Sequence, residues 1–101
     1  MSTERAFETF TVPRTNVVSS DLGYSVEVLG RTGILYREGD KSAFVDSEVL
    51  ATGHGIAVFR ASIKKWQPPH DREEVTQMQR NRIIDNIRRA IEFQKQPVEV
   101  L

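Results

Sequence analysis

The chain has 101 residues, of which 39% are hydrophobic and 28% are charged, a composition typical of one small soluble globular domain. The 14 basic and 14 acidic residues cancel, which disfavours nucleic-acid binding, because that binding needs an excess of positive charge. There is no cysteine, so disulfides, thiolate metal sites and thiol catalysis are excluded. No apolar stretch reaches the length of a signal peptide or a membrane span, and we expect a cytoplasmic protein that does not enter a membrane.

Residues 1–22 are polar and indicate an N-terminal arm that is only partly ordered, since chain ends are loose unless they dock. Phe7–Val12 alternates loosely between apolar and polar residues and stops at Pro13, a pattern that is compatible with a short strand. We expect a single α+β domain over residues 23–101.

Four segments with apolar alternation follow, and short glycine-containing turns separate them. This pattern predicts an antiparallel meander, with strands at Tyr24–Leu29, Ile34–Glu38, Lys41–Glu48 and Ile56–Ile63. Val98–Leu101 is a short terminal strand or an extended tail. The predicted sheet therefore has about four to five strands.

The two-residue turn Gly39–Asp40 sets the register of the central hairpin. The resulting pairs match charge with charge and apolar with apolar: Glu38 with Lys41, Tyr36 with Ala43, Ile34 with Val45 and Leu35 with Phe44. Applied to the preceding strand, the same logic puts Glu27 opposite Tyr36 on the apolar face. We therefore expect a bulge or a longer loop between those two strands.

A long amphipathic helix is predicted over Asp71–Lys95, with its first residue within Arg72–Gln77. Two capping patterns are present there, Asp71 with Glu74 and Thr76 with Gln79. The apolar residues form a stripe that packs on one face of the sheet: Ile83, Ile84, Ile87, Ala90 and Ile91. A single helix covers only one face. The second apolar face needs the arm or another chain as cover, so a structural module that forms a homodimer through that face is an open alternative.

The opposite helix face carries charged residues of both signs, namely Arg82, Asp85, Arg88, Arg89 and Glu92. Asp85 is spaced to pair with Arg89 and Arg82, which indicates an ordinary solvated face. A row of arginines can instead follow phosphates. The alternative is a small regulatory or nucleic-acid-binding module that uses Arg80, Arg82, Arg88 and Arg89.

The sequence contains no catalytic or metal-binding motif. His54 and His70 lie in separate loops, without a set of carboxylates at metal-ligand spacing. A phosphate-binding loop and an activated nucleophile are also absent. We expect neither enzymatic activity nor a cofactor.

One hairpin and its exit gather four carboxylates, Glu38, Asp40, Asp46 and Glu48. Paired carboxylates can bind Mg²⁺ or perform acid–base chemistry, but Lys41 opposes Glu38, and Asp40 is a turn residue. The functional interpretation is an acidic surface that binds a basic partner. Trp66 either closes the core or anchors an interface, and the core interpretation is favoured.

Several of these features occur together in one order. The order is Tyr36-Arg37-Glu38-Gly39-Asp40, Asp46-Ser47-Glu48, Ser62-Ile63, Trp66, Pro68-Pro69, and then a helix with Ile83-Ile84, Asn86-Ile87, Ala90 and Phe93. Over residues 24–101, this arrangement resembles the immunity protein 74 family of bacterial polymorphic toxin systems.

The resemblance implies a small cytoplasmic α+β protein that binds and neutralises a cognate toxin by stoichiometric inhibition, without chemistry of its own. Immunity proteins often block toxins with acidic side chains that mimic the substrate. The predicted partner-binding residues are Glu38, Asp40, Asp46, Glu48 and Trp66.

Overall fold

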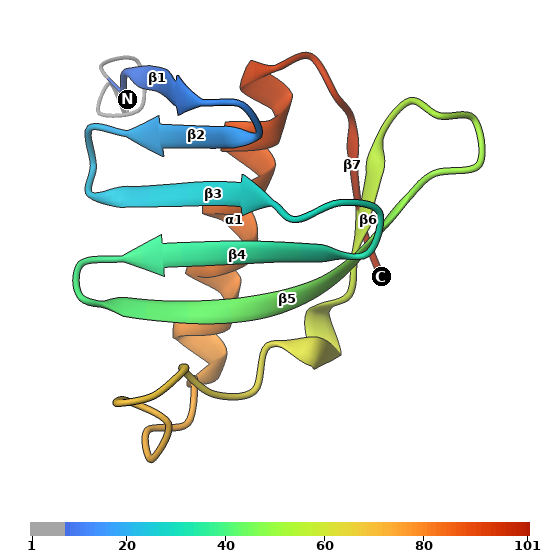
Figure 1. The fold of residues 1–101 in the computed structure, drawn as a ribbon. Coiled ribbons are helices and arrows are strands. Elements are labelled where there is room, and N and C mark those ends of the chain that lie inside the picture. Colours follow the sequence, from blue (N-terminus) through green and yellow to red (C-terminus); the bar gives the residue numbers. More distant parts are fainter. Residues whose placement is uncertain (1–7) are drawn as a thin grey trace, which may run out of the picture.

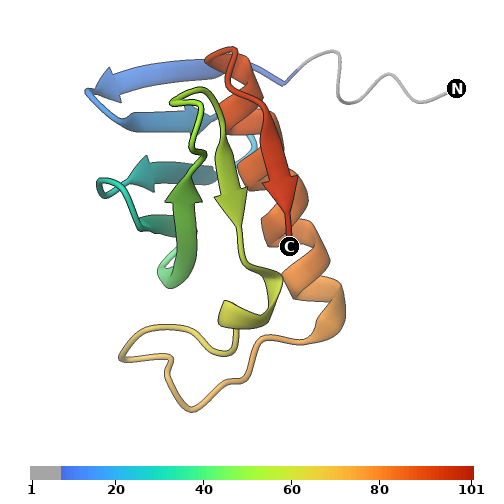
Figure 2. The same ribbon diagram turned by 90° about the vertical axis from the view of Figure 1, so that its right-hand side faces the viewer.

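A sheet of seven strands curls around one C-terminal helix in the computed structural model, which describes residues 8–101 (Figure 1). The strands are β1 (Phe10–Arg14), β2 (Val17–Ser20), β3 (Tyr24–Val28), β4 (Gly33–Glu38), β5 (Lys41–Val49), β6 (Ile56–Val58) and β7 (Val98–Val100). The helix α1 spans Gln77–Phe93, and a short 3₁₀ helix, η2, spans Arg60–Ser62. Figure 2 shows β6 and β7 turned away from the plane of β1–β4, so that the sheet bends around α1.

The predicted α+β class is confirmed, but the predicted sheet of about four to five antiparallel strands was too small. The strands follow the order of the sequence, and all neighbours are antiparallel except β6 and β7, which are parallel. β1 and β2 come from the predicted arm and extend one edge of the sheet. β7 is parallel because α1 first carries the chain back along the sheet.

The predicted arm is described only in part. Its strand prediction includes Phe7, which lies outside the described residues, whereas β1 runs past Pro13 to Arg14. The division into an arm of residues 1–22 and a domain of residues 23–101 stays a prediction.

The register of the central hairpin is confirmed, including the pairs Glu38 with Lys41 and Tyr36 with Ala43. The preceding strands are joined by a longer loop, as expected, because Val28 pairs with Ile34. This loop moves Glu27 opposite Leu35 on the outer face, where its carboxylate lies 3.0 Å from Nη1 of Arg37.

The predicted strand Ile56–Ile63 was too long, because β6 ends at Val58 and the chain turns into η2. The hydroxyl of Ser62 explains this turn. It donates to the carbonyl of Phe59 at 2.6 Å and accepts from the backbone N–H of Asp46 at 2.9 Å. The turn also buries the side chain of Ile63 completely in the core, so the chain exchanges strand pairing for burial of apolar surface.

The core lies between α1 and the inner face of the sheet. The predicted helix stripe is confirmed, since Ile83, Ile84, Ile87, Ala90 and Ile91 are all buried. They pack with inward residues of the strands: Val18, Tyr24, Val26, Ile34, Tyr36, Ala43, Val45 and Val58. Within residues 8–101, no helix is both long enough and apolar enough to cross a membrane.

The helix is shorter than the predicted Asp71–Lys95, because the later of the two capping patterns is used. The Thr76 hydroxyl accepts from the backbone N–H of Gln79 at 3.1 Å, and the Gln79 side chain accepts from the N–H of Thr76 at 2.9 Å. This reciprocal capping box satisfies two N–H groups that the first helical turn leaves open.

We predict that Thr76→Ala destabilises the protein by about 1 kcal/mol, because it removes the acceptor of the capping box. Urea unfolding followed by circular dichroism measures this loss. Thr32→Ala is the matched control, since Thr32 is exposed and has no side-chain hydrogen bond within residues 8–101. Equal losses in the two variants would contradict the assignment of Thr76 as the cap.

Candidate functional site

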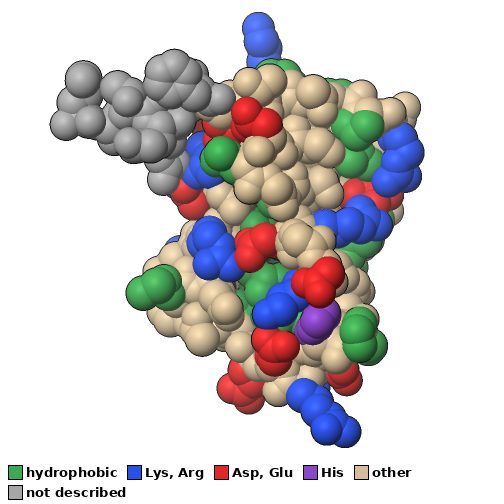
Figure 3. Space-filling model, turned by 90° about the vertical axis from the view of Figure 1, so that its left-hand side faces the viewer, with side chains coloured by type: hydrophobic (Ala, Val, Ile, Leu, Met, Phe, Trp, Pro, Cys, Tyr) green, Lys and Arg blue, Asp and Glu red, His purple; other side chains and the backbone are tan. Residues whose placement is uncertain are grey.

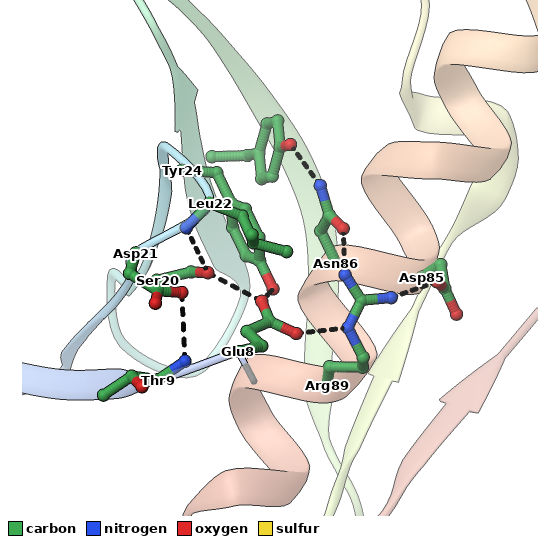
Figure 4. A network of polar contacts seen from close by, with 10 residues as sticks. Glu8, Thr9, Ser20, Asp21, Leu22, Tyr24, Asp85, Asn86 and Arg89 are labelled. Carbon is green, nitrogen blue, oxygen red and sulfur yellow. Dashed lines mark hydrogen bonds and ion pairs between the residues drawn. The ribbon is translucent and has the colours of Figure 1, made fainter. Parts of the chain in front are cut away.

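A buried carboxylate just before β1 starts a chain of polar contacts between α1 and the sheet (Figure 4). The side chain of Glu8 is only 2% exposed. Its Oε2 accepts from the Ser20 hydroxyl at 2.6 Å and from the Tyr24 hydroxyl at 2.5 Å. Its Oε1 accepts from Nε of Arg89 on α1 at 2.8 Å. The N-terminal segment, the sheet and the helix therefore meet at one charged group.

This chain of polar contacts continues across the interface through Asn86, a polar residue on the buried face of α1. Nη2 of Arg89 donates to Oδ1 of Asn86 at 2.6 Å, and Nδ2 of Asn86 donates to the Tyr36 hydroxyl at 2.8 Å. That hydroxyl donates to Oε1 of Glu38 at 2.7 Å. Arg82 closes the chain with two bonds to the Glu38 carboxylate, at 3.1 and 2.6 Å. Each buried polar side chain in this series of contacts thus has a partner, as a low-polarity interface requires.

These contacts shift the pKa values of the carboxyl and phenol groups that they join. Burial raises the pKa of Glu8 and of Glu38, but hydrogen bonds outweigh it, and both carboxyls lie below their ordinary value of 4.5. The donors that lower the pKa of Glu38 are Arg82 and Tyr36. Burial and the bond to Glu8 raise the pKa of Tyr24 to about 12. Burial and Glu38 also raise the pKa of Tyr36. At neutral pH the carboxylates are charged and the phenols are neutral.

A pocket of about 330 Å³ opens beside this chain, at the end of the molecule that carries the β2–β3 and β4–β5 turns. It is lined by Leu22, Tyr24, Glu38, Arg82 and Asn86. Figure 3 looks onto this end, where acidic and basic side chains interleave around a histidine. The polar groups of the pocket already have partners, since Arg82 bonds to Glu38, Tyr24 to Glu8 and Asn86 to Tyr36, so the pocket presents a neutralised surface.

The β4–β5 turn carries a second group of charges. Asp40, whose side chain is 85% exposed, lies 3.6 Å from Nε2 of His70. Nδ1 of His70 lies 3.6 Å from Glu73, and Glu73 accepts from Nζ of Lys41 at 2.7 Å. The hydrogen bond from Lys41 and its charge lower the pKa of Glu73. These contacts fasten the 64–76 connector to the hairpin.

The structure separates the four predicted carboxylates. Along β5 the side chains alternate between buried and exposed, and Asp46 and Glu48 are exposed. They lie on the outer face with Phe44, which is 43% exposed. Glu38 instead faces α1 and bonds to Arg82. The hairpin therefore presents carboxylates on two surfaces rather than one cluster, because strand residues alternate between faces.

Trp66 is 2% exposed, which supports the core interpretation of this residue. Its indole N–H is buried and has no hydrogen-bond partner within residues 8–101. Nζ of Lys41 lies 5.5 Å from the centre of the ring, a distance typical of a cation–π contact.

The arginines of α1 are used within the fold. Arg89 pairs with Asp85, as predicted, and Arg82 pairs with Glu38. Arg80 donates to the carbonyls of Ile63 and Val75, at 2.8 and 3.2 Å. These contacts occupy three of the four guanidinium groups that the nucleic-acid alternative requires.

Sequence reasoning missed Glu8 and Asn86. A signal existed for Asn86, because its spacing from Ile83 and Ala90 places an amide on the apolar stripe. Glu8 contacts Arg89 across 81 positions of sequence, and local patterns contain no information about such a contact. Within residues 8–101, no three side chains of the metal-ligating types lie close enough to hold a metal ion.

The fold and its surface define a small α+β protein with a sealed helix–sheet interface and exposed charge at one end and on one sheet face. A family model described as Immunity protein 74 matches residues 25–100, and the chain belongs to this family. The resemblance drawn from the sequence is thereby confirmed. Searches of curated proteins and of solved structures found no match.

We predict that Tyr36→Phe destabilises the protein by about 1–3 kcal/mol, because it leaves Asn86 and Glu38 short of a buried partner. Urea unfolding at pH 7 measures the change. Adding Asn86→Leu should recover part of the loss, since replacing both partners by apolar groups removes the unsatisfied amide. If Tyr36→Phe loses less than about 0.5 kcal/mol of unfolding free energy, the chain of polar contacts contributes little to stability.

Acid should destabilise the protein through Glu8 and Glu38. The pKa of each carboxyl is lowered on folding from an ordinary value of 4.5, so its contribution is complete above that value and is lost as the pH falls through the lowered pKa. Urea midpoints between pH 6 and pH 3 measure this loss. In Glu38→Gln the midpoint should fall less steeply over the same range, and an unchanged slope would contradict the assignment.

Proposed function

We propose that this protein binds a cognate toxin domain in the cytoplasm and neutralises it stoichiometrically, without chemistry of its own. The family match over residues 25–100 carries this proposal. The exposed charged and aromatic side chains of β5 support it, because they give a binding partner a surface to contact.

The proposed contact surface is the outward strip of β5, formed by Phe44, Asp46 and Glu48 and called here the β5 strip. An exposed aromatic residue beside charged groups is typical of protein interfaces. The side chains of Asp46 and Glu48 have no hydrogen bond or ion pair within residues 8–101. Two unneutralised carboxylates suit a partner with a basic surface.

The other predicted partner-binding residues are placed differently. Asp40 is exposed at the hairpin tip, beside His70 and at the other end of β5 from Asp46 and Glu48. Glu38 already bonds to Arg82, and Trp66 is buried. These two residues would contact a partner only after their internal contacts were exchanged, so we give them a supporting role.

The alternatives find less support. The guanidinium contacts of Arg80, Arg82 and Arg89 disfavour nucleic-acid binding by α1. A symmetric homodimer through the outer sheet face would bring Asp46 and Glu48 of two copies together, which like-charge repulsion opposes.

A toxin domain encoded by the neighbouring gene is the probe for this proposal. Cells that express the domain should grow only when the full-length protein is co-expressed, and calorimetry should give one protein bound per toxin domain. Failure both to bind and to restore growth would contradict the proposal for that pair.

We predict that the double variant Asp46→Asn/Glu48→Gln binds the toxin domain about tenfold more weakly, a loss of about 1.4 kcal/mol. Its binding should also depend less on salt, because charges at an interface act through long-range attraction. The matched control is Asp71→Asn/Glu92→Gln, which removes two exposed carboxylates away from the β5 strip. If both doubles weaken binding equally, net charge rather than the β5 strip is responsible.

A further inference from the structure

The segment before the first strand of a sheet is an unusual place for a buried charge such as that of Glu8. Its side chain is 2% exposed, although it precedes the first strand of the sheet. It also lies outside the family match, which begins at residue 25. The carboxylate is nevertheless fully engaged, with two donors on Oε2 and one on Oε1. The residues around it therefore form a receptor for a carboxylate.

The donors of this receptor are held in place by contacts that do not involve Glu8. Ser20 and Tyr24 face each other in the β2–β3 register, and the ring of Tyr24 stacks on Tyr36 with the ring centres 5.9 Å apart. Arg89 is held by Asp85 and Asn86 on its other side. Three donors from three elements thus point at one position before a ligand arrives. Such preorganisation is what separates a binding site from a flexible surface pair.

The segment that carries Glu8 is held less firmly than the donors. We call residues 8–14 the strap. Beyond Glu8, Thr9 and Asp21 exchange two hydrogen bonds of 3.0 Å, and the ring of Phe10 lies 5.1 Å from that of Phe93. β1 is an edge strand, its register with β2 shifts between Thr11 and Arg14, and most of it is exposed. An edge strand with interrupted pairing is the part of a sheet that is most readily exchanged.

We propose that Ser20, Tyr24 and Arg89 form a carboxylate-binding site that Glu8 occupies in cis, and that the site accepts a carboxylate in trans when the strap is displaced. The ligand chemistry is that of an ionised Asp or Glu side chain or of a small free carboxylate. A charge-assisted bond from Arg89 and short bonds from two hydroxyls are the contacts such a ligand needs. This inference does not depend on toxin binding.

The test uses full-length Glu8→Ala, which empties the site. Sodium acetate is titrated to about 100 mM, against sodium chloride at equal ionic strength, and the Nε–Hε resonance of Arg89 is followed by NMR. We expect a saturable shift in the variant and none in the wild-type protein, whose site is full. Acetate should also raise the melting temperature of the variant by about 2–5 °C relative to chloride.

Two further variants keep the test decisive. Ser20→Ala in the Glu8→Ala background should weaken acetate binding severalfold, which locates the site. If Glu8→Ala folds in acetate but not in chloride, that result also supports the site. If it folds in neither, the titration is repeated with Glu8→Gln, where acetate must displace an amide that matches the donors poorly. Absence of an acetate-specific response in both variants, together with equal binding of the two peptides described next, overturns the proposal.

A peptide spanning Glu8–Arg14 separates the two sources of carboxylate. Binding of this peptide to Glu8→Ala, at least tenfold more tightly than its counterpart with Gln in place of Glu8, identifies a protein segment as the ligand. Binding of acetate without the peptide identifies a small carboxylate. Either result supports the site, whereas equal binding of the two peptides, without an acetate response, would show that the strap docks through its backbone alone.

Discussion

The hydrogen bond between Asn86 on α1 and the Tyr36 hydroxyl on β4 is the contact on which the helix–sheet interface depends. It lies where a single helix must seal the inner face of a curled sheet, and Tyr36 is completely buried there. An amide at that position must be satisfied, since a buried polar group without a partner is costly. The amide oxygen of Asn86 accepts from Arg89, and its nitrogen donates to the Tyr36 hydroxyl, which in turn donates to Glu38. The apolar stripe supplies the driving force, and the polar chain fixes the orientation of the helix on the sheet.

Features that depend on near neighbours could be predicted from the sequence. The register of the central hairpin follows from one turn and its flanking pairs, and the stripe of α1 follows from helical spacing. The end of β6 could not be predicted, because the Ser62 hydroxyl that turns the chain bonds to Asp46, 16 residues away. The parallel pairing of β7 and the position of Glu8 also depend on distant segments. The periodicity of a sequence contains no information about contacts between segments that are far apart in it.

The candidate surface illustrates the same limit. Four acidic residues of one hairpin form a cluster in sequence, but the two-residue period of a strand directs Glu38 inward and Asp46 and Glu48 outward. The four carboxylates therefore do not form one cluster in the fold. In the structure, Glu38 holds the helix through Arg82, the other three carboxylates face solvent, and Trp66 lies in the core.

The parallel pairing of β6 with β7 also constrains how the chain folds. Ile56 pairs with Val98, so the last strand cannot enter the sheet until α1 and the connector before it have been made. During synthesis the edge of β6 that pairs with β7 stays open until residues 98–100 have left the ribosome. The long loop that this pairing closes makes it an entropically late step. Residues 98–100 thus complete the pairing of β6 and themselves become the edge of the sheet, a short strand that offers few open groups to another chain.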